Sequence, residues 1–308
     1  MSDLTIITYH YVRPIIDSKF PKIKGLEIEG FKRQLDFLES EYSIVSTDQV
    51  IDRIKNNKPL PPKACWLTFD DGYKEHYKYV FPELIKRKLT GAFFVPSSPI
   101  KENKMLGVNS IHHIIACVND VNILIKDLKN LWIKFGLSEE KFHESYKKYA
   151  VSNRFDDAET KFFKNILQFG LPDKTKKEII SILFQKYLGV SEVEFSSNFY
   201  LSIDDTKKLI SNGMYVGSHG ANHLHYDQTD AQKQKDDILS SLEFLEEVGA
   251  STSNWIMCYP HGHYNDTTLS LLKELGALIG VTIEPRKANL GIDNPFKLTR
   301  LDTNDFPQ

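Results

Sequence analysis

The stretch ACWLTFDDG, residues 64–72, decides how this chain is interpreted. Its first part, residues 64–67, is apolar and is typical of a buried strand. The strand then ends in two adjacent carboxylates, Asp70 and Asp71, and in Gly72. Ionised carboxylates are costly to bury unless a metal ion, another cation or hydrogen-bond donors meet them. The stretch therefore predicts a buried strand that ends at a functional site.

The composition allows a large core, and the net charge gives no indication of a basic surface for nucleic acid. The chain has 308 residues, 41% of them hydrophobic, which suits one large domain or two small ones, and its net charge is -2. No apolar run reaches membrane-spanning length, and residues 1–8 lack the features of a signal peptide. The three cysteines share no disulfide or metal spacing. We expect a cytoplasmic protein, either free or peripheral to the inner membrane, and the sequence does not indicate its oligomeric state.

Strand and helix patterns alternate at both ends of the chain. We expect Thr47 to cap a short helix, and we expect strands over residues 4–9, 43–45, 64–67, 91–95, 214–217, 255–258, 278–283 and 296–298. Repeated strand–helix units with right-handed crossovers imply a parallel sheet. Because a parallel barrel gathers the loops after its strands on one face, and the polar motifs follow strands, we favour a barrel.

The middle of the chain has a different pattern. Between about residues 99 and 200 there are successive amphipathic stretches and no good strand candidate. The predicted domains are therefore a barrel, residues 1–99 and 201–308, and a helical insertion, residues 100–200. The insertion is either extra scaffold or a lid or substrate-recognition element. Its Trp132 could stack on a ring of a substrate, although core packing is the preferred interpretation.

A second polar motif, GSHGANH, covers residues 217–223. On a helical turn His219 and His223, four apart, share a face and can reach one ion. Polar loop histidines are the alternative, and three further histidines could be decoys: His225, His261 and His263. Adjacent strand residues point to opposite sides, so Asp70 and Asp71 can serve one site only if the backbone turns there. Together the motifs predict a mononuclear hydrolytic metal site.

These two motifs carry a family resemblance. TFDDG at residues 68–72 and SHGANH at 218–223 resemble the polysaccharide deacetylase family (NodB homology domain, carbohydrate esterase family 4) over residues 4–99 and 201–306. The resemblance implies an α/β fold, a distorted (β/α) barrel of the polysaccharide deacetylase type with an inserted all-helical segment. It also implies that Asp70 is the general base. The ligands of Zn²⁺ or a similar divalent ion would be Asp71, His219 and His223.

A third motif, CYPHGHYN at residues 258–265, resembles the family's Arg-x-Pro-Tyr segment with two departures. Cys258 stands where an arginine usually orients the base, and Arg300 is a candidate replacement, with a surface salt bridge as the alternative. His261 stands where the family has Tyr or Phe, whose backbone N–H helps to form an oxyanion hole. The resemblance adds further candidates for substrate contact: Tyr259, Pro260 and Tyr264.

The candidate for the general acid lies near the start of the chain. The family's C-terminal Leu-x-His is absent, whereas ITYHYV at residues 7–12 resembles the circularly permuted members, in which that strand begins the chain. The resemblance implies that His10 protonates the leaving amine. A packed histidine at a strand end is the alternative.

The resemblance implies metal-dependent hydrolysis of an N-acetyl or other N-acyl group on an amino sugar. The expected partner is an acylated amino sugar, either an oligosaccharide or a nucleotide- or lipid-linked precursor of a surface polysaccharide. Other hydrolases on the same scaffold remain open, namely an O-acyl esterase, a deformylase or a cyclic-amide hydrolase. A non-catalytic sugar-binding protein is the last alternative.

Overall fold

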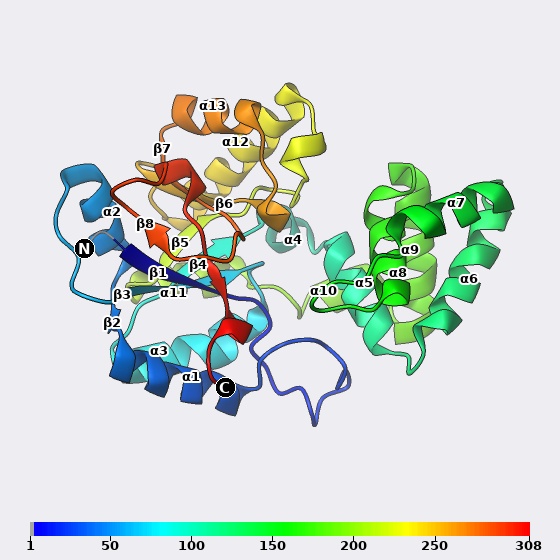
Figure 1. The fold of residues 1–308 in the computed structure, drawn as a ribbon, viewed down its shortest axis with the longest axis horizontal. Helices are drawn as coiled ribbons and strands as arrows, with labels where there is room; N and C mark the ends of the chain where they lie inside the picture. Colours follow the sequence, from blue (N-terminus) through cyan, green and yellow to red (C-terminus); the bar gives the residue numbers. More distant parts are fainter. Residues whose placement is uncertain (1–2) are drawn as a thin grey trace. The chain divides into compact units, whose positions relative to one another are not determined.

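The computed structural model describes residues 3–308 in two compact units (Figure 1). One unit runs from the start of the described residues to Pro14 and continues over Gly25–Glu102 and Asn198–Gln308. The other comprises Ile15–Lys24 and Asn103–Ser197. The sequence pattern groups residues 15–24 with the barrel, whereas the structure groups them with the helical unit. Met1 and Ser2, the start of the predicted barrel domain, lie outside the described residues.

The first unit is built on one curled sheet. Its main path runs β7-β6-β5-β4-β3-β1-β8, with β2 paired to β3 and β9 paired to β1. All these pairs are parallel except β8 with β1. The strands are β1 Asp3–Tyr9, β2 Ser43–Ile44, β3 Ala64–Asp70, β4 Ala92–Val95, β5 Tyr215–Ser218, β6 Trp255–Cys258, β7 Ala277–Val281, β8 Ala288–Asn289 and β9 Leu301–Asp302.

Helices connect the parallel strands, as right-handed crossovers require. They are α1 Ile28–Glu41, α2 Thr47–Asn56, the π-helix η1 His76–Val80, α3 Phe81–Arg87, α4 Ser97–Glu102, α11 Ile203–Ser211, α12 Ala231–Val248 and α13 Asp266–Glu274. Short 3-10 helices are η2 Tyr226–Gln228, η3 Pro260–Gly262, η4 Pro295–Lys297 and η5 Thr303–Asp305. The expected cap at Thr47 is wrong by one residue, because Ser46 accepts the hydrogen bond from the Gln49 N–H, while Thr47 accepts one from the Trp66 indole at 3.0 Å.

A short C-terminal segment joins the two edges of the curled sheet. Leu298 pairs with Val281 of β7, and Leu301 of β9 pairs with Ile7 of β1. The strand expected over residues 296–298 is wrong except at Leu298, since Pro295 and the Asn294 cap start the 3-10 helix η4 instead. The predicted distorted (β/α) barrel is confirmed.

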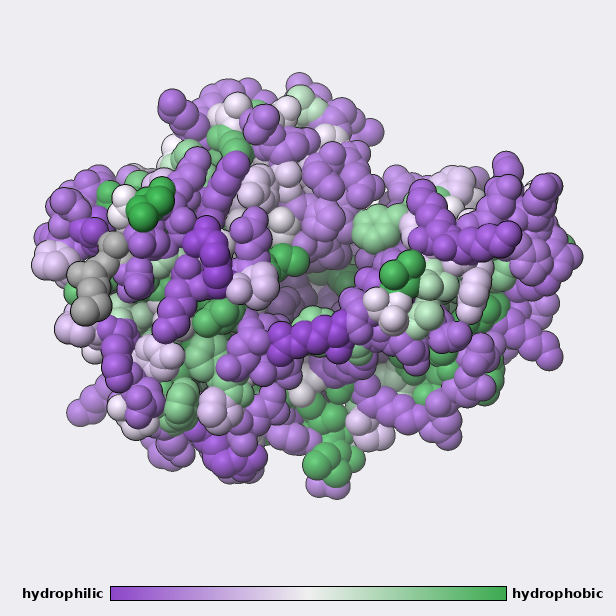
Figure 2. Space-filling model, viewed as in Figure 1, coloured by the Kyte–Doolittle hydropathy of each residue, from purple (hydrophilic) through white to green (hydrophobic). Residues whose placement is uncertain are grey.

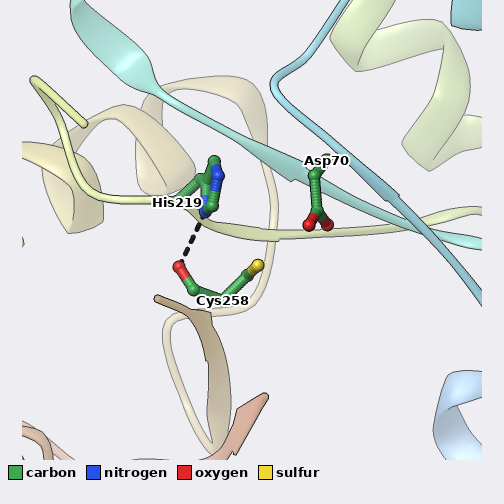
Figure 3. Close-up of side chains that lie close together, drawn as sticks. All are labelled: Asp70, His219 and Cys258. Carbon is green, nitrogen blue, oxygen red and sulfur yellow. Dashed lines mark hydrogen bonds between the residues drawn. The ribbon is translucent and has the colours of Figure 1, made fainter. Parts of the chain in front are cut away.

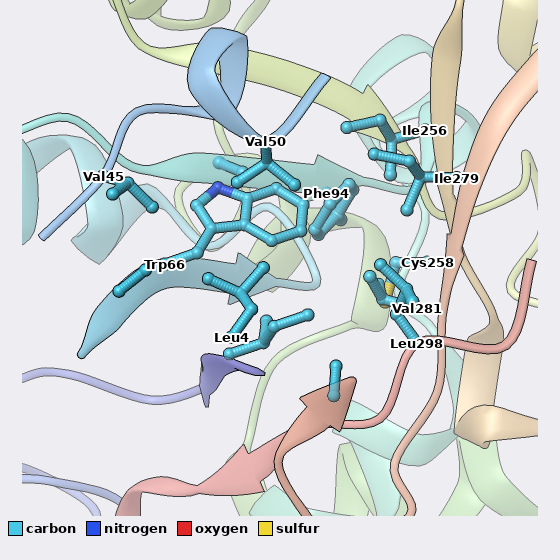
Figure 4. Packing of buried hydrophobic residues seen from close by; sticks show 14 residues of the cluster. Leu4, Val45, Val50, Trp66, Phe94, Ile256, Cys258, Ile279, Val281 and Leu298 are labelled. Atoms are coloured by element: carbon cyan, nitrogen blue, oxygen red, sulfur yellow. The ribbon is translucent and has the colours of Figure 1, made fainter. Parts of the chain in front are cut away.

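A buried apolar cluster lies in the barrel interior and reaches Cys258 at the end of β6. Figure 4 shows Trp66 and Phe94 in edge-to-face contact, with ring centroids 6.3 Å apart, among side chains from several strands. Every residue of β3 is buried, which agrees with the apolar run that begins it. Burying a large apolar side chain contributes about 1.5–3 kcal/mol, so this packing holds the strand ends in place.

The helical unit has a core of its own. Trp132 is buried, its indole N–H donates to the Ser138 carbonyl at 2.8 Å, and its ring meets the edge of Phe142. Trp132 is therefore a core residue of the helical unit rather than a surface on which a sugar could stack. The helices are α5 Gly107–Ala116, α6 Val121–Lys134, α7 Glu139–Tyr149, α8 Ala158–Phe169, α9 Asp173–Leu188 and α10 Glu192–Ser196.

No helix among residues 3–308 combines the length and the apolar character needed to cross a membrane. Figure 2 shows a face on which hydrophilic residues predominate and hydrophobic ones form small separate patches.

Candidate active site

The polar motifs meet at the carboxyl ends of neighbouring strands. Asp70 ends β3, His219 directly follows β5, and Cys258 ends β6. Because β3, β4, β5 and β6 are consecutive in the sheet, the carboxyl ends of these strands lie together at one end of the barrel. In Figure 3 the Asp70 carboxylate and the Cys258 thiol point into the same space beside His219.

The backbone turns at the second aspartate. Asp71 has φ 72° and Gly72 has φ 62°, both in the left-handed region. The turn that a shared site requires is therefore present, and Asp71 itself adopts the left-handed conformation, which aspartate tolerates better than most residues. The turn places Asp71 beside His219 while Asp70 keeps the direction of the strand.

Asp71, His219 and His223 form a buried Asp–His–His triad. Oδ1 of Asp71 lies 3.2 Å from Nε2 of His219 and 3.4 Å from Nε2 of His223. The other carboxylate oxygen accepts a hydrogen bond from the Tyr73 hydroxyl, a contact that the sequence did not indicate. All three members of the triad are no more than 7% exposed in their side chains.

The triad has the donor set of a divalent metal site. The Cys258 carbonyl can only accept, so Nδ1 of His219 donates to it at 2.7 Å, and Nε2, which faces Asp71, carries a lone pair whenever the ring is neutral. Oδ1 of Asp71 is buried and accepts no well-formed hydrogen bond from any residue of the described chain. Two lone pairs 3.2 Å apart need a proton or a cation between them. A divalent ion therefore fits this position.

The pKa shifts of the two histidines agree with a position that favours a positive charge. Burial alone would lower the pKa of His219, but Cys258 and the Asp71 carboxylate outweigh it and raise the pKa well above its ordinary value. Burial lowers the pKa of His223, so its ring is neutral and able to ligate.

Asp70 is held by Arg300. The guanidinium donates from Nη1 to Oδ1 at 2.8 Å and from Nη2 to Oδ2 at 2.7 Å, and the Arg300 side chain is 1% exposed. Thr8 on β1 donates a further hydrogen bond to Oδ2 at 3.2 Å. Burial alone would raise the pKa of Asp70, but the Arg300 charge outweighs it and holds the pKa well below its ordinary value.

The position of Arg300 accounts for the small side chain at position 258. Arg300 lies between Leu298 and β9, on the segment that joins the two sheet edges, and its Nε donates to the Thr282 carbonyl at 2.7 Å. The small Cys258 leaves room for the guanidinium, and Sγ accepts from Nη2 at 3.2 Å. Asp70, His219 and Cys258 also lie close enough to suggest a metal group, but the Arg300 charge among them excludes a cation there.

His10 lies at the open side of the site. It follows β1, its side chain is 43% exposed, and Nε2 lies 3.9 Å from Oδ2 of Asp70. The buried His76, which the sequence did not indicate, meets the His10 carbonyl through its own Nε2 at 2.6 Å. Burial lowers the pKa of His76 to about 4, so the neutral ring must carry its proton on Nε2 and donate it to that carbonyl.

The third motif is divided between the site and the core. The His261 ring lies 4.3 Å from the His223 ring, and its backbone has φ 57°. Tyr259 is fully buried and donates to the Phe296 carbonyl at 2.8 Å, so its side chain belongs to the core rather than to a substrate surface. Pro260 is also buried, whereas Tyr264 is partly exposed.

The loop that carries the two histidines is organised by a carboxylate from α12. Asp237 is buried and accepts hydrogen bonds from the backbone N–H groups of Ala221 at 3.0 Å and Asn222 at 2.8 Å, and from the Tyr226 hydroxyl at 2.8 Å. It was not predicted, because a single acidic residue within a helix gives no signal of its tertiary partners.

Gly220 has no room for a side chain beside this carboxylate. A Cβ atom there would lie 2.6 Å from Oδ2 of Asp237 and 2.7 Å from the Tyr226 hydroxyl oxygen, and φ is 68°. We expect Gly220→Ala to destabilise the protein by about 2–5 kcal/mol, the sum of left-handed strain and overpacking. Urea unfolding measures the change.

Gly213→Ala is the matched control for this substitution. Gly213 has φ 82°, and a Cβ there would meet nothing within 4 Å among the described atoms. We expect it to show only the backbone strain, about 1–2 kcal/mol. Equal losses for the two variants would mean that the packing around Gly220 is not tight.

Comparisons with known proteins agree with this fold. The family model described as polysaccharide deacetylase matches residues 57–120 and 144–279, which is more than half of the chain. The chain belongs to the polysaccharide deacetylase family. The deacetylase PplD of Streptococcus pyogenes, solved with acetate, has a TM-score of 0.61 over 97% of this chain and 92% of that one at 18% identity, which supports the fold.

Two curated relatives match a shorter stretch. The chain is 28% identical over 90 residues to the putative polysaccharide deacetylase YxkH of Bacillus subtilis, covering 29% of this chain and 32% of that protein. It is 38% identical over 80 residues to the poly-beta-1,6-N-acetyl-D-glucosamine N-deacetylase of Escherichia coli, covering 25% of this chain and 12% of that protein. The matches thus span a third or less of each relative.

Proposed function

We propose that this chain is a metal-dependent hydrolase that removes an N-acetyl or other N-acyl group from an amino sugar. The observation that carries the proposal is the buried Asp–His–His triad with the Asp70–Arg300 pair beside it. Membership of the polysaccharide deacetylase family supports the same reaction class. Asp71, His219 and His223 would hold the ion, with Zn²⁺ as the first candidate.

The residues around the triad divide the remaining work. When bound, a divalent cation supplies Lewis-acid activation of water and of the acyl oxygen. Asp70, kept ionised by Arg300, accepts a proton from the attacking water. The His261 backbone N–H stabilises the negative charge that develops on the acyl oxygen. His10, on the open side, donates a proton to the departing amine, so that a free amine and a carboxylate leave.

The position of β1 supports this use of His10. β1 pairs in parallel with both β3 and β9, and the family match begins only after it, at residue 57. We take the chain to be a circularly permuted member in which the strand that precedes the acid comes first.

The substrate is proposed to be an oligosaccharide or a nucleotide- or lipid-linked precursor of a surface polysaccharide, processed in the cytoplasm. The name of the Escherichia coli relative, which specifies an N-acetyl amino sugar polymer, supports the sugar class. Activity recovered only from an exported fraction would contradict the cytoplasmic location.

Removing the ion should remove the activity. We expect dialysis against a chelator to lower acetate release from N-acetylated amino sugars by at least about 100-fold, and Zn²⁺ to restore it, because the oxyanion and the water both depend on Lewis-acid chemistry. The same panel with O-acetyl and N-formyl sugars separates esterase and deformylase activities. A chelated protein that stays fully active would contradict the proposal.

A further inference from the structure

A second group of potential ligands lies outside the triad. His225, Asp227 and His263, called here the outer cluster, each offer a ligand atom within 4.8 Å of the other two. Nδ1 of His263 lies 2.9 Å from Oδ2 of Asp227. The side chains of these two residues are 39% and 34% exposed, so an ion in solution can reach them.

The backbone that carries the outer cluster is well anchored. Tyr226, the first residue of η2, lies between His225 and Asp227 in the sequence and is fully buried. Its carbonyl accepts from the Gln234 side chain at 2.8 Å and from the Asn265 side chain at 3.1 Å. Asn265 also caps α13, two residues after His263, so it ties both segments of the outer cluster together. The three ligands are therefore held near one another by the fold.

The donor set suits a transition metal. Imidazole nitrogen with carboxylate oxygen is the ligand combination of zinc and its neighbours, whereas calcium and magnesium prefer oxygen alone. Ligand atoms on one tetrahedral ion are about 3.4 Å apart, given bonds of about 2.1 Å. The ligand atoms of the outer cluster, all within 4.8 Å of one another and 2.9 Å apart for His263 and Asp227, lie around that spacing.

The outer cluster is joined to the triad through stacked rings. His225 stacks on His261 with centroids 3.8 Å apart and planes 4° apart, and His261 in turn contacts His223. The His263 ring lies 5.2 Å from the His225 ring. A continuous row of imidazoles thus runs from the buried triad to the surface.

We propose that His225, Asp227 and His263 form a second site for a zinc-type divalent ion, more exposed than the triad and separate from it. The Asp–His–His triad and the outer cluster share no ligand. Water completes the coordination of the outer ion, because only three protein ligands are present.

Zinc stoichiometry of the full chain tests the proposal. After equilibrium dialysis against Zn²⁺ alone, wild type should hold about two ions per chain, and Asp227→Asn/His263→Gln about one. Asp71→Asn should lose the inner ion and keep the outer one. His143→Gln is the matched control, since that exposed histidine lies 3.7 Å from the carboxylate of Glu139 and outside the outer cluster, and the variant should hold about two ions.

If wild type and Asp227→Asn/His263→Gln each hold one ion, the outer site is overturned. If Asp71→Asn then holds none, that one ion is the inner one and the proposed function stands. Two ions in wild type and in Asp227→Asn/His263→Gln would also overturn the outer site. A loss for His143→Gln equal to that of the outer variant would show adventitious histidine binding and overturn it as well. With Co²⁺ as the probe, the absorption assigned to the outer ion should disappear in the outer variant alone.

Discussion

Asp70→Asn is expected to lower the rate of amide hydrolysis by roughly 10²–10⁴-fold while zinc content stays at the wild-type level. The carboxamide keeps the shape of the side chain and removes the basic oxygen. Asp70 is not one of the three residues of the Asp–His–His triad, so the ion should still bind. Turnover with a synthetic N-acetyl sugar and metal analysis of the same sample provide the measurement.

The control for this variant is a second carboxylate that also pairs with arginine. Asp293 accepts from Nη1 and Nη2 of Arg286 at 2.8 and 3.1 Å, outside the site, and Asp293→Asn should turn over like wild type. If wild type and Asp70→Asn both bind zinc and are equally inert towards every acylated sugar tried, the enzyme proposal fails and a sugar-binding role takes its place.

Arg300→Met should be the most destabilising single change at the site, by about 3–5 kcal/mol in the free energy of unfolding. The substitution leaves the Asp70 carboxylate, which is 3% exposed, without its main counter-charge. It also leaves the Thr282 carbonyl without the hydrogen bond from the Arg300 Nε. Denaturant unfolding of the purified variants at neutral pH measures the loss.

Two further variants make the result interpretable. Arg286→Met removes an exposed arginine from a comparable bidentate pair, and solvent screening should make its effect much smaller. Asp70→Asn/Arg300→Met removes both buried charges, so it should recover part of the stability lost in Arg300→Met. A double variant no more stable than Arg300→Met would mean that packing, rather than the unpaired charge, causes the loss.

Much of the fold was predictable because it depends on local patterns. The strand at Trp255–Cys258 has the bounds expected from periodicity. The short strands β8 and β9 have two residues each and carry no periodic signal. The strand expected over residues 296–298 does not form, because a proline and an asparagine cap favour a helical turn there.

The site was predictable only where its residues are close in sequence. Asp70 with Asp71, and His219 with His223, form short motifs that strand ends bring together. Tertiary contacts such as His76 with the His10 carbonyl, or Asp237 with the histidine loop, leave no pattern in the chain. Arg300 could be named from the sequence, but its contact with Asp70 depends on how the sheet edges are joined.

That joining segment has a consequence for synthesis on the ribosome. Asp70 and the triad emerge before Arg300, which is 230 residues later than its partner. Until the segment from Leu298 to β9 has emerged and docked between β7 and β1, the Asp70 carboxylate has no arginine and must stay hydrated. Docking of this segment therefore both closes the sheet and supplies the arginine that holds the base.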